Sequence, residues 1–220
     1  VVDPYAAFTA ETQFQDQSDP RGTLALNPLK LKESAGAARV LFKTADSEGL
    51  TRLGFGFRQT LARAFTDPLG EETRRFTSND GGIEWQTDVK QPLLAQRVLY
   101  KGSLLVFQPV FYSKSGDLET VDDLLRVAFP GRESVADFWR MTDVNFTNDF
   151  SAQITRNLGV NLAVQWVYDK FDVAALVDPA LAASADPAVL AAYAAQVDKN
   201  VRKAGQFRQV LSLALTYRLF

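Results

Sequence analysis

Four acidic residues have the type and spacing that could support chemistry. Glu84 and Asp88 are four residues apart, and Asp143 and Asp149 are six apart. On β-strands an even spacing places both members of each pair on the same face. Paired carboxylates can act as general acid and base, or they can bind calcium.

Basic residues follow the same two-residue period and favour a structural role instead. Eight strands closed into a barrel enclose an interior just wide enough for side chains, where opposite charges would neutralise each other. In a wider barrel the same side chains would line a pore. The predicted lumen-facing charged set is Arg52, Arg58, Glu84, Asp88, Asp143, Asp149, Arg208 and Arg218.

The residue inventory argues against most enzyme chemistry. The chain contains no histidine and no cysteine, and histidine is the commonest general base and metal ligand. A membrane-embedded hydrolase that pairs serine or aspartate with histidine would therefore lack its base. The stretch 78–82 resembles part of a calcium loop, but its ligand spacing fails and it reads as a turn. We predict no catalytic residue, no cofactor and no metal site.

Composition excludes two further classes. The net charge of the 220 residues is −2 and no basic patch stands out, so nucleic-acid binding is not expected. No apolar run approaches the roughly 20 residues of a transmembrane helix. Because the chain begins at Val1 without methionine, we expect either that a signal peptide has been removed or that further residues precede it.

The elements that would position these charges are strands with a two-residue hydrophobic period. The final segment places Leu211, Leu213, Leu215, Tyr217 and Leu219 on one face. Such alternation predicts an antiparallel transmembrane β-barrel with apolar residues outward. Strands are predicted at about 4–15, 34–44, 52–65, 82–91, 97–113, 138–154, 157–169 and 207–220. Pro109 indicates either a bulge or a strand end that rises above the sheet.

The predicted connections alternate in length. Long loops at about 16–33, 66–81, 114–137 and 170–204 alternate with short ones at about 45–50, 92–96 and 155–156. Outer-membrane barrels have short periplasmic turns and long external loops, so both termini would be periplasmic. The last long loop predicts a helix capped by Asp186 and ended at Gly205, and Asp117–Val127 predicts a second helix. A soluble lipocalin-like barrel is the structural alternative and would place its apolar residues inward.

An ordered series of short motifs carries a family resemblance over most of the chain. The motifs are Thr9–Phe14, Asn27–Leu29, Ser34–Gly36, Leu53–Phe57, Tyr100–Gly102, Asp143–Phe146, Tyr168–Asp169 and Leu215–Tyr217. Together they resemble an uncharacterised outer-membrane β-barrel family, a domain of unknown function typical of Bacteroidota and their relatives.

The resemblance has two departures with consequences. Relatives end on an aromatic residue two positions after the closing tyrosine, where this chain has Leu219 followed by Phe220. Relatives also carry strands ahead of the region that matches Tyr5, which implies that the eight strands can be part of a larger barrel. The family has no assigned catalytic residues to carry over.

The sequence therefore predicts a single outer-membrane β-barrel domain over residues 1–220, in a bacterial outer membrane. We expect a non-enzymatic, structural or accessory role in an envelope assembly. A porin-like passive channel for small hydrophilic solutes is the alternative, and a membrane-embedded enzyme ranks third. Expected partners are outer-membrane lipid, proteins that bind the external loops, and the barrel-assembly machinery, which would bind the C-terminal strand. Trp166, Tyr168, Tyr217 and Phe220 are the predicted membrane-interface anchors.

Overall fold

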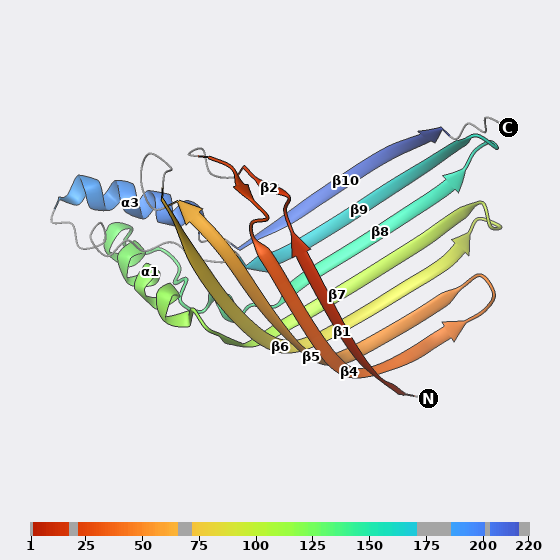
Figure 1. The fold of residues 1–220 in the computed structure, drawn as a ribbon, viewed down its shortest axis with the longest axis horizontal. Helices are drawn as coiled ribbons and strands as arrows, with labels where there is room; N and C mark the ends of the chain where they lie inside the picture. Colours follow the sequence, from red (N-terminus) through yellow and green to blue (C-terminus); the bar gives the residue numbers. More distant parts are fainter. Residues whose placement is uncertain (1, 18–21, 66–71, 171–185, 201–202, 216–220) are drawn as a thin grey trace.

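One antiparallel sheet dominates the chain (Figure 1). A computed structural model describes residues 2–17, 22–65, 72–170, 186–200 and 203–215. The sheet contains, in spatial order, β1 (Asp3–Thr12), β4 (Leu29–Lys43), β5 (Glu48–Phe65), β6 (Thr73–Leu93), β7 (Val98–Tyr112), β8 (Asp143–Gln153), β9 (Leu158–Lys170) and β10 (Lys203–Leu215). The predicted all-β antiparallel class is confirmed. Among the described strands β1 and β10 do not pair, so this sheet is not a closed barrel.

The short connections lie at one end of the strands and the long connections lie at the other end (Figure 1). Four-residue turns join β4 to β5, β6 to β7 and β8 to β9. The opposite end carries two helices, α1 (Ser115–Ala128) and α3 (Pro187–Asn200). It also carries a short hairpin of β2 (Gln15–Asp16) and β3 (Leu24–Ala25). No helix in the described part of the chain is both long and apolar enough to cross a membrane.

Several element limits differ from those predicted. β6 begins at Thr73, inside the predicted loop 66–81, because backbone pairing with β5 continues through the polar stretch Thr73–Gly81. β4 likewise begins inside the predicted loop 16–33. The segment predicted to start a strand at Phe138 instead forms the 3-10 helix η1 (Phe138–Arg140), and β8 begins only at Asp143.

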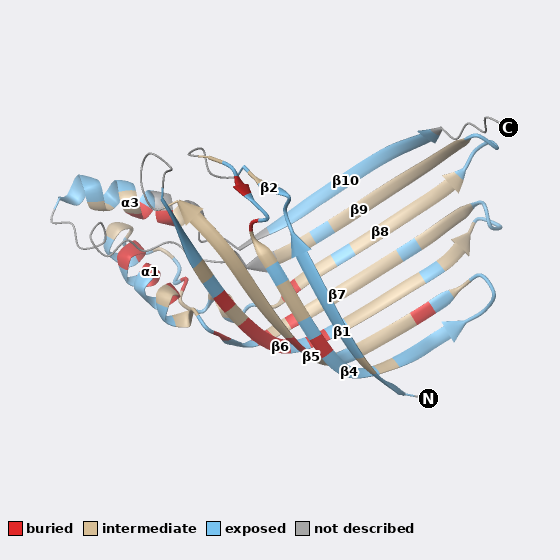
Figure 2. Cartoon of the chain, in the orientation of Figure 1, coloured by how far each residue is buried: buried red, intermediate tan, exposed pale blue. Residues whose placement is uncertain are grey.

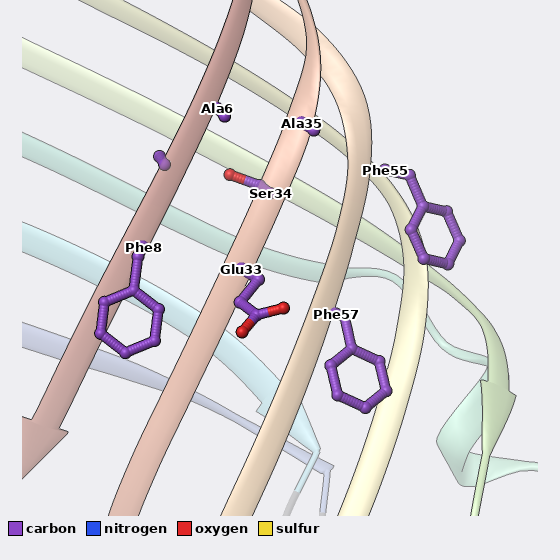
Figure 3. Close-up of a pocket in the computed structure, with 8 residues that line it drawn as sticks. Ala6, Phe8, Glu33, Ser34, Ala35, Phe55 and Phe57 are labelled. Carbon is purple, nitrogen blue, oxygen red and sulfur yellow. The ribbon is translucent and has the colours of Figure 1, made fainter.

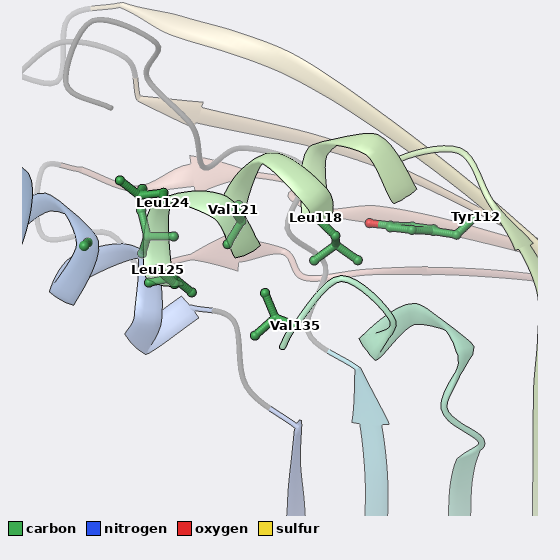
Figure 4. Close-up of a cluster of buried hydrophobic side chains, with 8 residues drawn as sticks. Tyr112, Leu118, Val121, Leu124, Leu125 and Val135 are labelled. Atoms are coloured by element: carbon green, nitrogen blue, oxygen red, sulfur yellow. The ribbon is translucent and has the colours of Figure 1, made fainter. Parts of the chain in front are cut away.

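The helices form a small core of their own at the end of the strands that carries the long connections. Figure 4 shows Leu118, Val121 and Leu125 of α1 directed toward Val135 in the loop that precedes β8. Asp186 accepts a hydrogen bond from the Ala188 backbone N–H at 2.8 Å, as the capping prediction requires. The predicted end at Gly205 is wrong, since α3 ends at Asn200 and Gly205 belongs to β10.

The sheet curls strongly about one face. Arg58 on β5 contacts Asp143 on β8, three strands away. A flat sheet would separate these strands by about 14 Å, so the contact requires curvature. We call the face with these residues the inner face. A Cβ on Gly54 of that face would lie 2.2 Å from the Ala35 carbonyl oxygen and 2.7 Å from the Tyr5 hydroxyl, so the close approach there requires glycine.

An irregularity lies where β6 meets β7. Gly81 pairs with Phe111 and Gly82 pairs with Pro109, which leaves Val110 as an extra residue. This is a β-bulge, so the first of the two alternatives that Pro109 indicates is confirmed. Proline suits the position because it has no N–H to donate to a regular ladder. Bulges strengthen local twist, and this one lies beside the inner-face charges.

Candidate functional site

The centre of the inner face is an ion-pair cluster around Arg58. Its guanidinium donates to both carboxylate oxygens of Asp80, from Nε at 2.9 Å and from Nη2 at 2.6 Å. Nη2 also donates to Asp143 at 2.7 Å. The Phe107 ring lies under the guanidinium, 3.8 Å from Cζ to the ring centroid, and Phe107 is fully buried. One side chain on β5 therefore connects β6, β7 and β8.

Two further ion pairs extend the cluster along the inner face. Lys32 Nζ lies 2.5 Å from the buried Glu84 carboxylate, which links β4 to β6. Arg52 forms a salt bridge with Asp88, which also accepts hydrogen bonds from Ser103 Oγ at 2.7 Å and from Gln86 Nε2 at 3.1 Å. We call these residues the inner charge cluster: Lys32, Arg52, Arg58, Asp80, Glu84, Asp88 and Asp143.

The inner charge cluster has the chemistry of a structural network. Each of its carboxylates is held by a cation, and Arg58 engages Asp80 with the bidentate geometry that favours a fixed arrangement. Buried charges are tolerated when they are paired in this way. The described residues contain no group of three acidic side chains placed to hold a metal ion.

The predicted lumen-facing set divides into three parts in the structure. Arg52, Arg58, Glu84, Asp88 and Asp143 are brought together in the inner charge cluster. Asp149 and Arg208 lie on β8 and β10, away from the cluster, opposite Lys101 and Gln165 respectively. Neither forms a salt bridge with another described residue. Arg218 lies outside the described residues.

Uncharged polar side chains cover the inner face on β8 and β9. Gln165 Nε2 donates to Asn145 Oδ1 at 3.1 Å, and Asn161 Nδ2 donates to Ser151 Oγ at 2.8 Å. These side chains are half-buried rather than buried. The inner face is therefore densely paired between β4 and β8 and more open toward β10.

Sequence reasoning missed three members of this site. Asp80 was assigned to a turn and Lys32 to a loop, because strand limits were placed too far along the chain. Phe107 lies in a strand that is apolar on both faces, so its orientation was ambiguous. The cross-strand register supplies the missing signal, because Arg58 pairs directly with both Lys32 and Asp80.

The opposite, outer face is apolar and exposed. Figure 2 shows that the edge strands β1 and β10 are exposed along most of their length. Eight large side chains that define the outer face are each between 40 % and 72 % exposed. We define the outer face by Leu53, Phe55, Ile83, Trp85, Phe146, Trp166, Leu211 and Leu213. Monomeric soluble proteins rarely expose a continuous apolar surface of this extent.

Two of the predicted anchors lie on this outer face. Trp166 and Tyr168 stack on β9 with their ring centroids 6.4 Å apart. Trp166 pairs with Phe146 and Phe207, and the row that contains Tyr168 includes Trp85. Tyr217 and Phe220 lie outside the described residues.

Comparison of the chain with protein-family models, with curated proteins and with solved structures found no match. The resemblance to an outer-membrane family stays a prediction from the sequence motifs.

Proposed function

We propose that this protein is an integral bacterial outer-membrane β-barrel with a non-enzymatic, structural or accessory role in the envelope. The observation that carries the proposal is the inverted polarity of the sheet. Charges such as Glu84 and Asp143 are buried on the inner face, whereas Leu53 and Ile83 are exposed on the outer face. A soluble sheet buries its apolar face instead, and a transmembrane barrel has an apolar exterior with a polar interior.

The aromatic residues support the same assignment. Trp166 and Tyr168 stack near the end of β9 that leads toward the helices. Aromatic residues form such girdles where a barrel crosses the membrane surface. The long connections and helices would then be external, and the short turns and both termini would be periplasmic.

The filled inner face favours a structural role over transport. Arg58, Phe107 and the carboxylates that they contact occupy space between β5 and β8. In a narrow barrel this packing would block a continuous water path. The work of the protein would then be done by its external part, where α1 and α3 provide a packed platform for envelope partners.

A charged substitution on the outer face tests membrane insertion. Leu53 is 57 % exposed, so Leu53→Arg should change the stability of a soluble sheet by no more than about 0.5 kcal/mol. Facing lipid, arginine should cost about 2–4 kcal/mol near the membrane centre. We expect Leu53→Arg to reduce the heat-modifiable, outer-membrane form, while Asp46→Arg in the β4–β5 turn leaves it unchanged. Equal amounts of folded protein for both variants would refute the proposal.

A passive channel is the second candidate, and the open part of the inner face favours it. Arg208 is exposed and Asn145, Gln165 and Asn161 are only half-buried, so a wider barrel would have a hydrated lumen along β8–β10. Single-channel recording of protein extracted intact from outer membranes separates the two functions. We expect no conductance from folded protein. Stable ohmic steps would assign transport instead.

Closure of the barrel can be tested directly because the chain has no cysteine. In an eight-stranded barrel β1 pairs with β10, whereas in a larger barrel other strands lie between them. Phe8→Cys combined in turn with Gln209→Cys, Leu211→Cys and Leu213→Cys places thiols on the outward faces of both strands. An intramolecular disulfide in the folded protein would establish direct pairing. Folded protein that forms none with any pair would indicate a larger barrel.

A further inference from the structure

A shallow groove crosses the outer face over β1, β4 and β5. Its volume is about 530 Å³, and it is open along the surface of the sheet rather than enclosed. Two rows of paired residues build it: Phe8, Glu33 and Phe57 form one, and Ala6, Ala35 and Phe55 form the other. Phenyl rings thus stand on both sides of a floor made of small side chains.

Glu33 is the exceptional residue in this groove. Figure 3 shows its carboxylate between the Phe8 and Phe57 rings. Lys32, the neighbouring cation, lies on the inner face with Glu84, and no described residue forms a salt bridge with Glu33. Glu33 is exposed, so water would hydrate it, whereas on a surface that faces lipid a carboxylate without a counter-charge would be costly.

We propose that this groove binds a phospholipid with a primary-ammonium headgroup. Glu33 would accept the ammonium, and an acyl chain would lie over Ala6 and Ala35 between the phenyl rings. This inference rests on the proposed membrane location and adds a lipid preference to it.

Charge and shape favour this occupant. An anionic phospholipid would bring a second negative charge beside Glu33. A protein segment would require a long complementary surface, whereas this groove spans three strands and its floor carries single methyl groups. An ammonium lipid supplies one cation and one flexible apolar chain, which matches one carboxylate and one apolar trough. It also satisfies Glu33 without any movement of Lys32.

Native mass spectrometry of the full chain, extracted folded from outer membranes, tests the proposal. Phosphatidylethanolamine and phosphatidylglycerol with identical acyl chains are the probes. We expect wild-type protein to retain phosphatidylethanolamine preferentially and Glu33→Gln to lower that retention about five-fold, equivalent to an ion pair of about 1 kcal/mol. Ala35→Phe should lower it too, by filling the floor. Glu48→Gln, which removes an exposed carboxylate near a turn, is the matched control.

Three results would overturn the lipid site. The first is equal retention of both lipids by wild-type protein, and the second is unchanged selectivity in Glu33→Gln. The third is retention of phosphatidylglycerol that depends on Mg²⁺, which would make a metal ion the partner of Glu33. Heat-modifiable mobility of the same samples keeps the two hypotheses apart. Protein that never reaches the outer membrane refutes the membrane proposal, whereas inserted protein without lipid preference refutes only the groove.

Discussion

Removal of the Arg58 guanidinium should destabilise the folded sheet more than any single change at an exposed ion pair. Arg58→Met keeps an unbranched apolar stem of similar reach and deletes the charge. The change withdraws three hydrogen bonds from Asp80 and Asp143 and one ring contact from Phe107. Both carboxylate side chains are less than 10 % exposed, so water cannot readily replace the cation.

The structure sets the scale of the effect. Removal of one partner from a buried ion pair costs about 3–5 kcal/mol because it leaves an uncompensated charge. We expect a loss in that range for Arg58→Met. An exposed pair contributes no more than about 1 kcal/mol, and Lys43 with Glu48 is such a pair, with side chains 68 % and 52 % exposed. Glu48→Gln should therefore change the unfolding free energy several-fold less.

Equilibrium urea unfolding in lipid vesicles, followed by tryptophan fluorescence, measures both variants. A combined variant adds Asp80→Asn and Asp143→Asn to Arg58→Met. If the cost comes from stranded charge, this variant should recover most of the loss, since a neutral site needs no cation. The reasoning is refuted if Arg58→Met costs less than about 1 kcal/mol, or if neutralising both carboxylates recovers nothing.

Four other substitutions test separate parts of the structure by unfolding or limited proteolysis. Gly54→Ala should destabilise the sheet by at least about 1 kcal/mol because the new Cβ meets a β4 carbonyl at 2.2 Å. Gly116→Ala, whose Cβ would meet nothing within 4 Å, should be neutral or stabilising. Asn27→Ala should speed proteolysis of the β1–β4 connection, since the buried amide holds the Arg63 backbone at 2.6 Å and 3.0 Å. Asp122→Ala should cost about 1–3 kcal/mol in the helical core by removing the acceptor for a backbone N–H, and full protection from protease would contradict this.

The strands were predictable where one face is apolar and the other polar. The segment from Asn157 has six apolar side chains at alternate positions, and β9 occupies Leu158–Lys170 almost as predicted. The two-residue hydrophobic period does not indicate a strand where a strand has no apolar face. Residues Thr73–Gly81 are mostly polar on both faces, so the hydrophobic period does not indicate a strand there. Backbone pairing with β5, and with β7 at Asp80 and Gly81, keeps them extended. Alternation of charged residues alone could not show that β6 begins as early as Thr73.

The sequence could predict most of the residues that belong to the inner charge cluster, but not which of these charges pair with each other. Alternation identified Arg52, Arg58 and three of the cluster's carboxylates as residues of one face. The pairing of these charges depends on the cross-strand register and on the curvature of the sheet. Neither property follows from a two-residue hydrophobic period. Arg58 reaches Asp143 only because the sheet curls over three strands. The bulge at Pro109, one of the two predicted alternatives, is one local cause of that curvature.

The two edge strands link the width of the barrel to its function. β1 and β10 are exposed along nearly all of their described length, and Phe8 and Leu211 each leave about two thirds of their surface uncovered. Long apolar edges invite pairing with any available strand. Seven antiparallel pairings lead from β1 to β10 across the sheet, so these two strands run in opposite directions. They can therefore pair antiparallel, directly or through an even number of further strands. Direct pairing would confine the inner charge cluster in a narrow lumen and support a structural role. Each added hairpin would widen the space beside β10, where Arg208 and the amides of β9 already lie open, and would favour transport.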